Sequence, residues 1–209
     1  GFTNKTIINA FQDLLHKPFE ETTLVFIPTA ANVEEGSKDW LIDDLYRTKE
    51  LGFKSIDIVD ISALEKDMWE KRIHEADVIM VGGGNTYHLI YWMNKSGFTD
   101  LIKDWLETKV YVGISAGSIV MSEDLSLTTA NKLYYEDSEK IDIEKGLGFV
   151  NFHIRPHLNS EWFPLVREDV LREQAKQIKG PIYAIDDKSA IKVVDGKIEI
   201  VSEGNWLKI

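Results

Sequence analysis

Apolar residues follow two periods along the chain, and together these predict alternating strands and helices. Strands are expected where apolar or β-branched residues run on with few interruptions, at Thr23–Ile27, Ser55–Val59, Val78–Val81, Val110–Val112, Leu125–Thr129, Phe149–Ile154 and Ile182–Ile185. Helices are expected where apolar residues recur at intervals of three and four, at Ile7–Leu15, Ser37–Gly52, Ala63–Ile73, Tyr87–Met93, Phe98–Leu106 and Trp162–Ile178. Because strands of this kind are buried on both faces, the pattern predicts a parallel sheet covered by helices.

The C-terminal end has a different pattern. Ala190–Val194 and Lys197–Val201 alternate between apolar and polar residues around Asp195-Gly196, which is a hairpin signal, and Trp206–Ile209 reads as a last short strand. The sequence therefore predicts an α/β fold, with a doubly wound, mostly parallel sheet, helices on both faces and an antiparallel C-terminal hairpin. We expect a single domain over residues 1–209, without repeats or linkers.

Composition narrows the class of function. With 44% hydrophobic and 28% charged residues, the chain is typical of a globular protein, and its net charge of −11 argues against nucleic acid or anionic membranes as partners. The absence of cysteine excludes disulfides, thiolate metal sites and a cysteine nucleophile, and fits a cytoplasmic protein. No signal peptide or membrane-length apolar run is visible, and no acidic cluster has metal-ligand spacing, so we expect no metal and no cofactor.

The stretch Val110–Met121 carries the strongest chemical signal. A β-rich run leads into Gly113-Ile114-Ser115-Ala116-Gly117 and then into a helical run, which is the strand, sharp turn and helix of a nucleophile elbow. Glycines on either side of such a serine let the strand and the helix pass closely. Ser115 is therefore the candidate nucleophile.

A serine hydroxyl needs a base to take its proton, and His157 is the candidate. It stands just past the end of the expected strand Phe149–Ile154, where ligands bind in open α/β sheets. The other histidines have ordinary interpretations as solvated or hydrogen-bonded side chains: His16, His74, His88 and His153.

The base itself needs a carboxylate to orient it. Asp187 is our first choice, because Asp186-Asp187 follows the expected strand Ile182–Ile185 at the same edge of the sheet. Asp186 competes for the role, and an acidic turn exposed to solvent is the simpler alternative for both.

The glycine run Gly82–Gly84 follows a buried strand and precedes a helix, so its amides suit negative charge. Gly84 and Ala116 are the candidate donors of an oxyanion hole, since an elbow supplies the amide after its nucleophile. A dinucleotide fingerprint is absent, because Tyr87 stands where the last glycine would be.

These motifs together resemble the dipeptidase E (aspartyl dipeptidase) family of serine peptidases, which is related to the cyanophycinases. The resemblance rests on Phe26-Ile27-Pro28, Val81–Thr86, Gly113–Gly117 and Pro156-His157, and it covers almost the whole chain. It implies a fold similar to class I glutamine amidotransferase domains, with serine replacing the cysteine at the elbow. It also implies that Ser115 is the nucleophile, His157 the general base, and Gly84 and Ala116 the oxyanion donors.

Three departures from that family affect what we expect. The family has an aspartate in a Thr-Thr-Asn-Asp stretch, whereas this chain has Thr128-Thr129-Ala130-Asn131, so a requirement for N-terminal aspartate in the substrate is in question. We take Asn131, and Asn85 after the glycines, as candidate substrate-binding residues. The family's third triad member is a glutamate, and Asp187 is shorter by one methylene. The family also begins with a strand before its first helix, so leading residues are expected to be missing here.

The sequence thus predicts a serine peptidase that cleaves dipeptides or short peptides through an acyl-enzyme. An esterase or amidase of the α/β-hydrolase kind is an alternative, and it would take its acid between serine and histidine, for example Asp137. A homologue that binds peptides without cleaving them is another. The segment Asn131–Lys145 is the expected specificity loop, and the sequence gives no indication of the oligomeric state.

Overall fold

The computed structural model describes residues 1–125, 132–136 and 145–209. Contacts divide the chain into two compact units. The first contains Gly1–Phe2 and Phe11–Gly117, and the second contains Thr3–Ala10 and Ser118–Ile209. Helix α1 (Lys5–Leu15) contributes residues to both. The expectation of a single domain stays a prediction.

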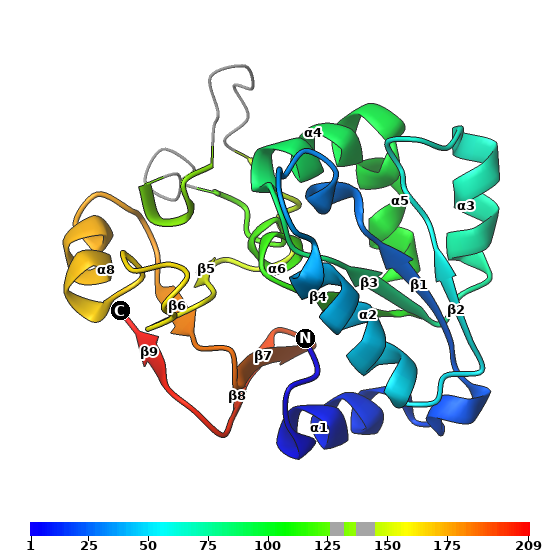
Figure 1. The fold of residues 1–209 in the computed structure, drawn as a ribbon, viewed down its shortest axis with the longest axis horizontal. Coiled ribbons are helices and arrows are strands. Elements are labelled where there is room, and N and C mark those ends of the chain that lie inside the picture. The colour runs from blue at the N-terminus through cyan, green and yellow to red at the C-terminus, as the bar shows by residue number, and fades with distance from the viewer. Residues whose placement is uncertain (126–131, 137–144) are drawn as a thin grey trace. The chain divides into compact units, whose positions relative to one another are not determined.

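The first unit is built on a parallel sheet with the order β2-β1-β3-β4 (Figure 1). Its strands are β1 (Thr23–Ile27), β2 (Ser55–Ile58), β3 (Val78–Val81) and β4 (Val110–Gly113). The central strand β3 is buried along its whole length, as its unbroken apolar sequence requires. In register, Val81 pairs with Ile27 on one side and with Gly113 on the other. The carboxyl ends of β1, β3 and β4 therefore lie at one edge of the sheet.

Helices cover both faces of this sheet. The α-helices are α2 (Asp39–Glu50), α3 (Lys66–His74), α4 (Thr86–Ser96) and α5 (Phe98–Trp105), and the 3₁₀ turns are η1 (Phe19–Glu21) and η2 (Thr29–Ala31). Thr48 of α2 contacts Met80 of β3 on one face. On the other face α3 packs against α5, where the ring of Trp69 contacts those of Phe98 and Trp105. Right-handed crossovers in the two directions from the centre of the sheet produce this arrangement.

The second unit carries a smaller sheet. In it β5 (His153–Arg155) runs parallel to β6 (Ile182–Ile185), and β9 (Trp206–Lys208) runs antiparallel to β6. A hairpin joins β7 (Ser189–Val194) to β8 (Lys197–Ser202) through Asp195 and Gly196, both at positive φ as its turn requires. Helix α8 (Glu168–Ala175) completes the unit, while the short α6 (Ala116–Ile119) crosses the boundary between the units.

The fold class predicted from the sequence is confirmed: a mostly parallel sheet with helices on both faces, followed by antiparallel C-terminal strands. Two predicted elements are shorter than expected. The strand expected from Phe149 begins at His153, and the helix expected from Trp162 begins only at Glu168, because Pro164 and a network of loop hydrogen bonds keep the preceding residues out of a helix. Most of the expected strand Leu125–Thr129 lies outside the described residues. Within the described ranges, each helix is too short or too polar to cross a membrane.

Candidate active site

Ser115 lies in a sharp turn between β4 and α6, as the elbow pattern predicts. Its φ of 49° is in the left-handed region, which residues other than glycine, asparagine, aspartate and histidine seldom adopt. The turn is fixed on both sides, because the amide of Ile114 donates to Val81 O at 2.9 Å and the amide of Gly117 donates to Ile114 O at 2.9 Å. A rigid turn of this kind holds a serine hydroxyl at the edge of the sheet instead of along the strand.

The glycines around Ser115 are there because backbones approach one another closely. A Cβ on Gly117 would lie 2.2 Å from the carbonyl oxygen of Val81, so no side chain fits at this position. A Cβ on Gly83 would lie 3.1 Å from the Cβ of Ser115, which is a tight contact. The glycine turn after β3 and the serine turn after β4 are thus neighbours at the edge of the first unit's sheet.

Gly84 is at the point where the strand connections reverse direction, between the carboxyl ends of β1 and β3. Its φ is +125°, and a Cβ there would lie 2.3 Å from the carbonyl oxygen of Ala30. Asn85 follows, and its amide donates to that same oxygen at 2.8 Å. The side-chain oxygen of Asn85 caps α4 by accepting from the amide of His88 at 2.9 Å. Its side-chain nitrogen remains available to donate to a ligand.

Gly84 and Ala116 are the predicted oxyanion donors. No backbone carbonyl in residues 1–125, 132–136 or 145–209 accepts a hydrogen bond from either amide. Gly84 lies just before α4 and Ala116 is the first residue of α6, where unsatisfied N–H groups favour a negative charge. They have the chemistry that a developing oxyanion needs.

His157 belongs to the second unit, two residues beyond the end of β5. Its φ is 66°, so the chain turns sharply after Pro156, and the amide of Leu158 donates to Ile185 O at 3.0 Å. This hydrogen bond ties the turn to the end of β6, the parallel neighbour of β5. Strained backbone at this histidine, as at Ser115, is typical of functional positions.

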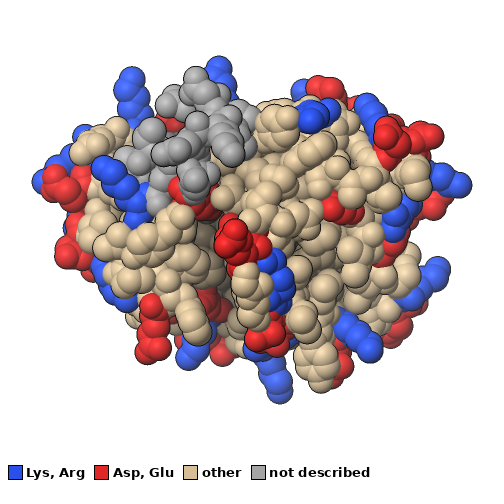
Figure 2. Space-filling view, turned by 45° about the horizontal axis from the view of Figure 1, so that its top comes forward, with Lys and Arg blue, Asp and Glu red and all other residues tan. Residues whose placement is uncertain are grey.

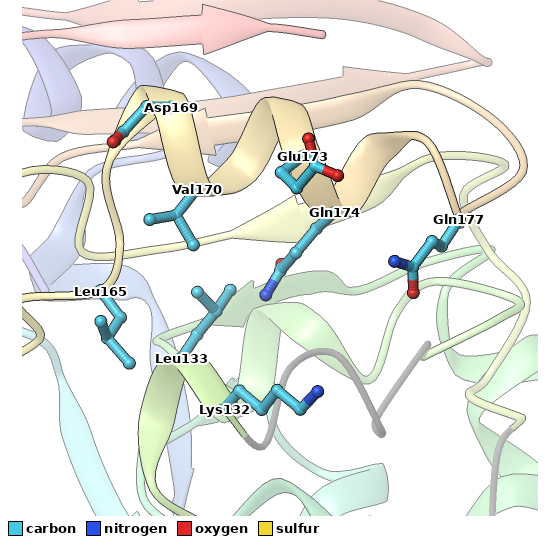
Figure 3. Close-up of a pocket in the computed structure, with 8 residues that line it drawn as sticks. All are labelled: Lys132, Leu133, Leu165, Asp169, Val170, Glu173, Gln174 and Gln177. Carbon is cyan, nitrogen blue, oxygen red and sulfur yellow. The ribbon is translucent and has the colours of Figure 1, made fainter.

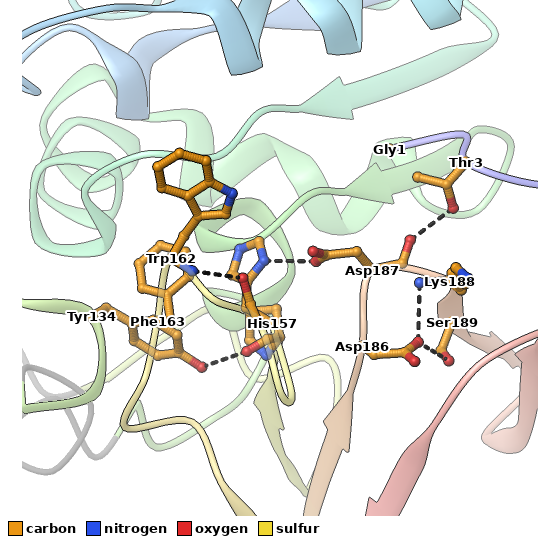
Figure 4. Close-up of polar contacts among 12 residues, drawn as sticks. Gly1, Thr3, Tyr134, His157, Trp162, Phe163, Asp186, Asp187, Lys188 and Ser189 are labelled. Atoms are coloured by element: carbon orange, nitrogen blue, oxygen red, sulfur yellow. Dashed lines mark hydrogen bonds and ion pairs between the residues drawn. The ribbon is translucent and has the colours of Figure 1, made fainter.

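The imidazole of His157 contacts Asp187, as Figure 4 shows. Its Nδ1 is 2.8 Å from Oδ1 of Asp187, and this hydrogen bond lowers the pKa of the aspartate below its ordinary value. The side chain of His157 is 22% exposed and that of Asp187 is 59% exposed, so the pair is open to solvent on the carboxylate side. An imidazole held through Nδ1 presents Nε2 for proton transfer.

Asp186, the competing carboxylate, has a different set of contacts. Its Oδ1 accepts from the amide of Lys188 at 3.0 Å and from the hydroxyl of Ser189 at 2.7 Å, and its Oδ2 accepts from the amide of Asn205. These hydrogen bonds lower its pKa although partial burial opposes them. Asp186 therefore braces the turn after β6, and Asp187 is the carboxylate that contacts the histidine.

An aromatic pair that the sequence did not single out packs beside His157. The ring of Phe163 stacks on the imidazole with centroids 4.6 Å apart, and Tyr134 packs edge-on against Phe163 at 5.5 Å. The buried hydroxyl of Tyr134 donates to Pro156 O at 3.1 Å, and burial raises the pKa of this hydroxyl. The adjacent aromatic residues Tyr134-Tyr135 and Trp162-Phe163 could have indicated this cluster from the sequence. Aromatic pairs are more often ordinary packing residues, however.

A separate pocket in the second unit lies between α8 and residues 132–133 (Figure 3). Its lining combines apolar side chains with charged and amide groups: Lys132, Leu133, Leu165, Asp169, Val170, Glu173, Gln174 and Gln177. None of the predicted site residues in the described part of the chain is among them. Asn131, the candidate substrate-binding residue, lies outside the described residues, as does Asp137 of the alternative mechanism.

Charge and metal chemistry give little further indication of a ligand. Figure 2 shows acidic and basic side chains scattered among one another on the face that it draws. Among residues 1–125, 132–136 and 145–209, no group of three or more histidine or acidic side chains is placed to hold a metal ion.

Comparison with known proteins gives a family match over nearly the full chain and relatives that cover two thirds of it or more. A family model described as peptidase family S51 matches residues 2–201. The uncharacterized peptidase Lin0382 of Listeria innocua serovar 6a is 26% identical over 213 residues, covering 93% of this chain and 94% of that protein. Peptidase E of Shewanella amazonensis is 31% identical over 152 residues, covering 67% of this chain and 61% of that protein.

Solved structures share the fold. A crystal structure of a Listeria monocytogenes EGD-e protein matches with a TM-score of 0.78 at 22% identity, covering 95% of this chain and 94% of the other. A peptidase from an acI-B1 Actinobacterium matches with a TM-score of 0.63 at 15% identity, covering 98% and 91%.

Proposed function

The chain belongs to peptidase family S51, and from this premise we propose that it is a serine peptidase that hydrolyses dipeptides or very short peptides through an acyl-enzyme. Ser115 is the nucleophile, His157 the general base, and Asp187 the carboxylate that orients the base. A relative named Peptidase E, together with the resemblance to dipeptidase E, supports the preference for very short substrates. The cysteine-free sequence favours the cytoplasm as the site of the reaction.

The hydrogen bond between His157 and Asp187 is the observation that carries the proposal. A carboxylate on Nδ1 fixes the tautomer that leaves Nε2 unprotonated, and it stabilises the imidazolium that forms when the serine proton is taken. Stacking on Phe163 restricts rotation of the ring. A solvated surface histidine does not need both restraints.

The reaction follows from these groups. Nε2 of His157 removes the proton of the Ser115 hydroxyl while Oγ attacks the scissile carbonyl, and the amides of Gly84 and Ala116 receive the resulting oxyanion. His157 then donates its proton to the departing amine as the C–N bond breaks and the acyl-enzyme forms. A water molecule then attacks the ester while the same imidazole takes its proton, and the imidazolium returns that proton to Oγ of Ser115 as the C–O bond breaks and the acid is released. No step needs a metal ion, so a chelator should leave the rate unchanged.

A dipeptide library scored by mass spectrometry tests this function, with the wild-type protein and Ser115→Ala side by side. We expect the wild type to release free amino acids from part of the library and Ser115→Ala to release none. Equal release by both proteins would contradict the proposal. Binding of dipeptides without turnover by the wild type would instead support a homologue that binds but does not cleave.

The α/β-hydrolase alternative differs from this proposal in which carboxylate orients the histidine, and two variants distinguish them. Asp187→Ala should lower kcat by about 10³–10⁴-fold and Asp137→Ala should leave it within about threefold of the wild type, since the contact to the histidine comes from Asp187. The reverse result would favour an acid that stands between serine and histidine in the chain.

A further inference from the structure

One side chain near the candidate base stands out because it is large, apolar and exposed. Trp162 is 86% exposed, the highest value among the exposed large hydrophobic side chains of the described residues. Figure 4 shows its indole extending from the loop, clear of the stack of His157 on Phe163. Tryptophan is highly buried on average, so this indole beside the loop of the candidate base leaves an unusual amount of apolar surface available to a ligand.

The loop that carries Trp162 is held by several hydrogen bonds. The amide of Ser160 donates to His157 O at 3.0 Å, and the amide of Asn159 donates to Val166 O at 3.0 Å. The guanidinium of Arg167 crosses the loop and donates to Ser160 O at 3.0 Å and to Phe163 O at 3.2 Å. The backbone that carries the indole is thus braced, so little backbone ordering entropy would be lost when a ligand covers the ring.

The loop also places Trp162 next to a residue that contacts the candidate base. Trp162 precedes Phe163, whose ring lies 4.6 Å from the imidazole of His157. In the proposed reaction this imidazole protonates the departing amine, so groups beside it face the substrate residue that carries that amine. In a dipeptide this is the C-terminal residue.

We propose that Trp162 is a specificity residue that packs against the side chain of the substrate's C-terminal residue and favours large apolar or aromatic side chains there. This inference rests on the proposed peptidase function. An apolar side chain covering the indole removes apolar surface from water on both partners, and aromatic rings add a stacking contribution. Because the C-terminal residue departs as the acyl-enzyme forms, the contact acts on acylation and is read in kcat/KM.

Pairs of dipeptides that differ only at the C-terminal residue test the proposal: Asp-Phe with Asp-Gly, Ala-Phe with Ala-Gly, and Leu-Phe with Leu-Gly. For any pair that the wild type cleaves, we expect kcat/KM to be about tenfold or more higher for the phenylalanine peptide. Trp162→Ala should bring this ratio close to one, mainly by slowing cleavage of the phenylalanine peptide. Trp162→Phe should restore most of the ratio. Trp206→Ala, at a 44% exposed indole on β9, is the matched control and should keep the wild-type ratio.

Three other outcomes would each overturn the inference about Trp162. An unchanged ratio in Trp162→Ala, with turnover intact, would reject the role of Trp162 and leave the peptidase function standing. A wild-type dimer that dissociates in Trp162→Ala, seen by analytical ultracentrifugation, would show that a second copy of the chain covers the indole. Failure of the wild type to cleave any of the six dipeptides, or the wider library, would remove the peptidase function and this inference with it.

Discussion

Nδ1 of His157 lies 2.8 Å from Oδ1 of Asp187, although the two residues are 30 positions apart in the sequence. The contact arises because β5 and β6 are parallel neighbours, so the residues that follow them leave the sheet at the same edge. The positive φ of His157 then turns the imidazole toward the acidic turn. Strand order and one strained residue together place the pair.

Removing the carboxylate of Asp187 should impair catalysis far more than folding. With Asp187→Ala we expect kcat to fall by about 10³–10⁴-fold, because the imidazole loses the group that fixes its tautomer and stabilises its charge. Steady-state kinetics on a dipeptide that the wild type cleaves gives this value. Asp186→Ala is the control: it should lower the free energy of unfolding by about 1–3 kcal/mol through the lost turn hydrogen bonds, with a much smaller effect on kcat. Similar kcat losses in the two variants would contradict the assignment.

The lowered pKa of Asp187 predicts a specific dependence of stability on pH. The carboxylate of Asp187 binds a proton more weakly in the folded state than in the unfolded state. The hydrogen bond to His157 therefore stabilises the fold at pH values above the unfolded pKa of about 3.9. The stabilisation is lost as the pH falls through the folded pKa. Urea unfolding from about pH 5 to about pH 2 should therefore show the wild type converging on Asp187→Asn as the pH falls. A constant difference between the two over this range would show that the contact does not shift the pKa.

Gly84 should tolerate a side chain much less well than other glycines at positive φ. Gly36 has a φ of +81° and open space around it, whereas a Cβ on Gly84 would meet the carbonyl of Ala30. Gly36→Ala is expected to cost about 1 kcal/mol of unfolding free energy from backbone strain alone. Gly84→Ala should cost about 1–3 kcal/mol more, because the turn must move. Chemical denaturation of both variants measures the difference, and equal costs would mean that the close approach to Ala30 is relaxed in solution.

The hydroxyl of Tyr134 should support the turn that carries His157. Tyr134→Phe removes the donor to Pro156 O and should lower the free energy of unfolding by about 1 kcal/mol. Since Pro156 directly precedes the base, we also expect a modest fall in kcat, about twofold to tenfold, with little change in KM. Kinetics and urea unfolding of the same preparation measure both. A wild-type kcat would show that the turn holds His157 without this hydrogen bond.

Local patterns were sufficient to predict much of the fold and several features of the site. Unbroken apolar runs predicted β1 and β3, and Asp195-Gly196 predicted the hairpin, because each depends on short-range rules of burial or turn geometry. The glycines around Ser115 predicted a tight turn, and the structure gives the reason in the carbonyl of Val81. The sequence also offered Asp186 and Asp187 as candidates at the correct edge of the sheet.

The remaining features depend on contacts between distant residues. Nothing local distinguishes Asp187 from Asp186, because the choice is made by a histidine 30 residues away and by the turn that Asp186 braces. The helical pattern from Trp162 was wrong for its first turns, since Arg167 and Pro164 stabilise a loop that the apolar spacing does not reveal. Phe163 and Tyr134 were missed for the same reason, as their role depends on where His157 lies.

Covalent labelling tests the central claim most directly, namely that Ser115 is a nucleophile activated by His157. Intact-protein and peptide mass spectrometry after treatment with a fluorophosphonate should show one phosphonyl group on wild-type Ser115. Ser115→Ala should show no labelling and His157→Ala should show slow labelling at most. Labelling of Ser115 that proceeds equally fast without His157, or a wild type that hydrolyses dipeptides yet is never labelled at Ser115, would contradict the account.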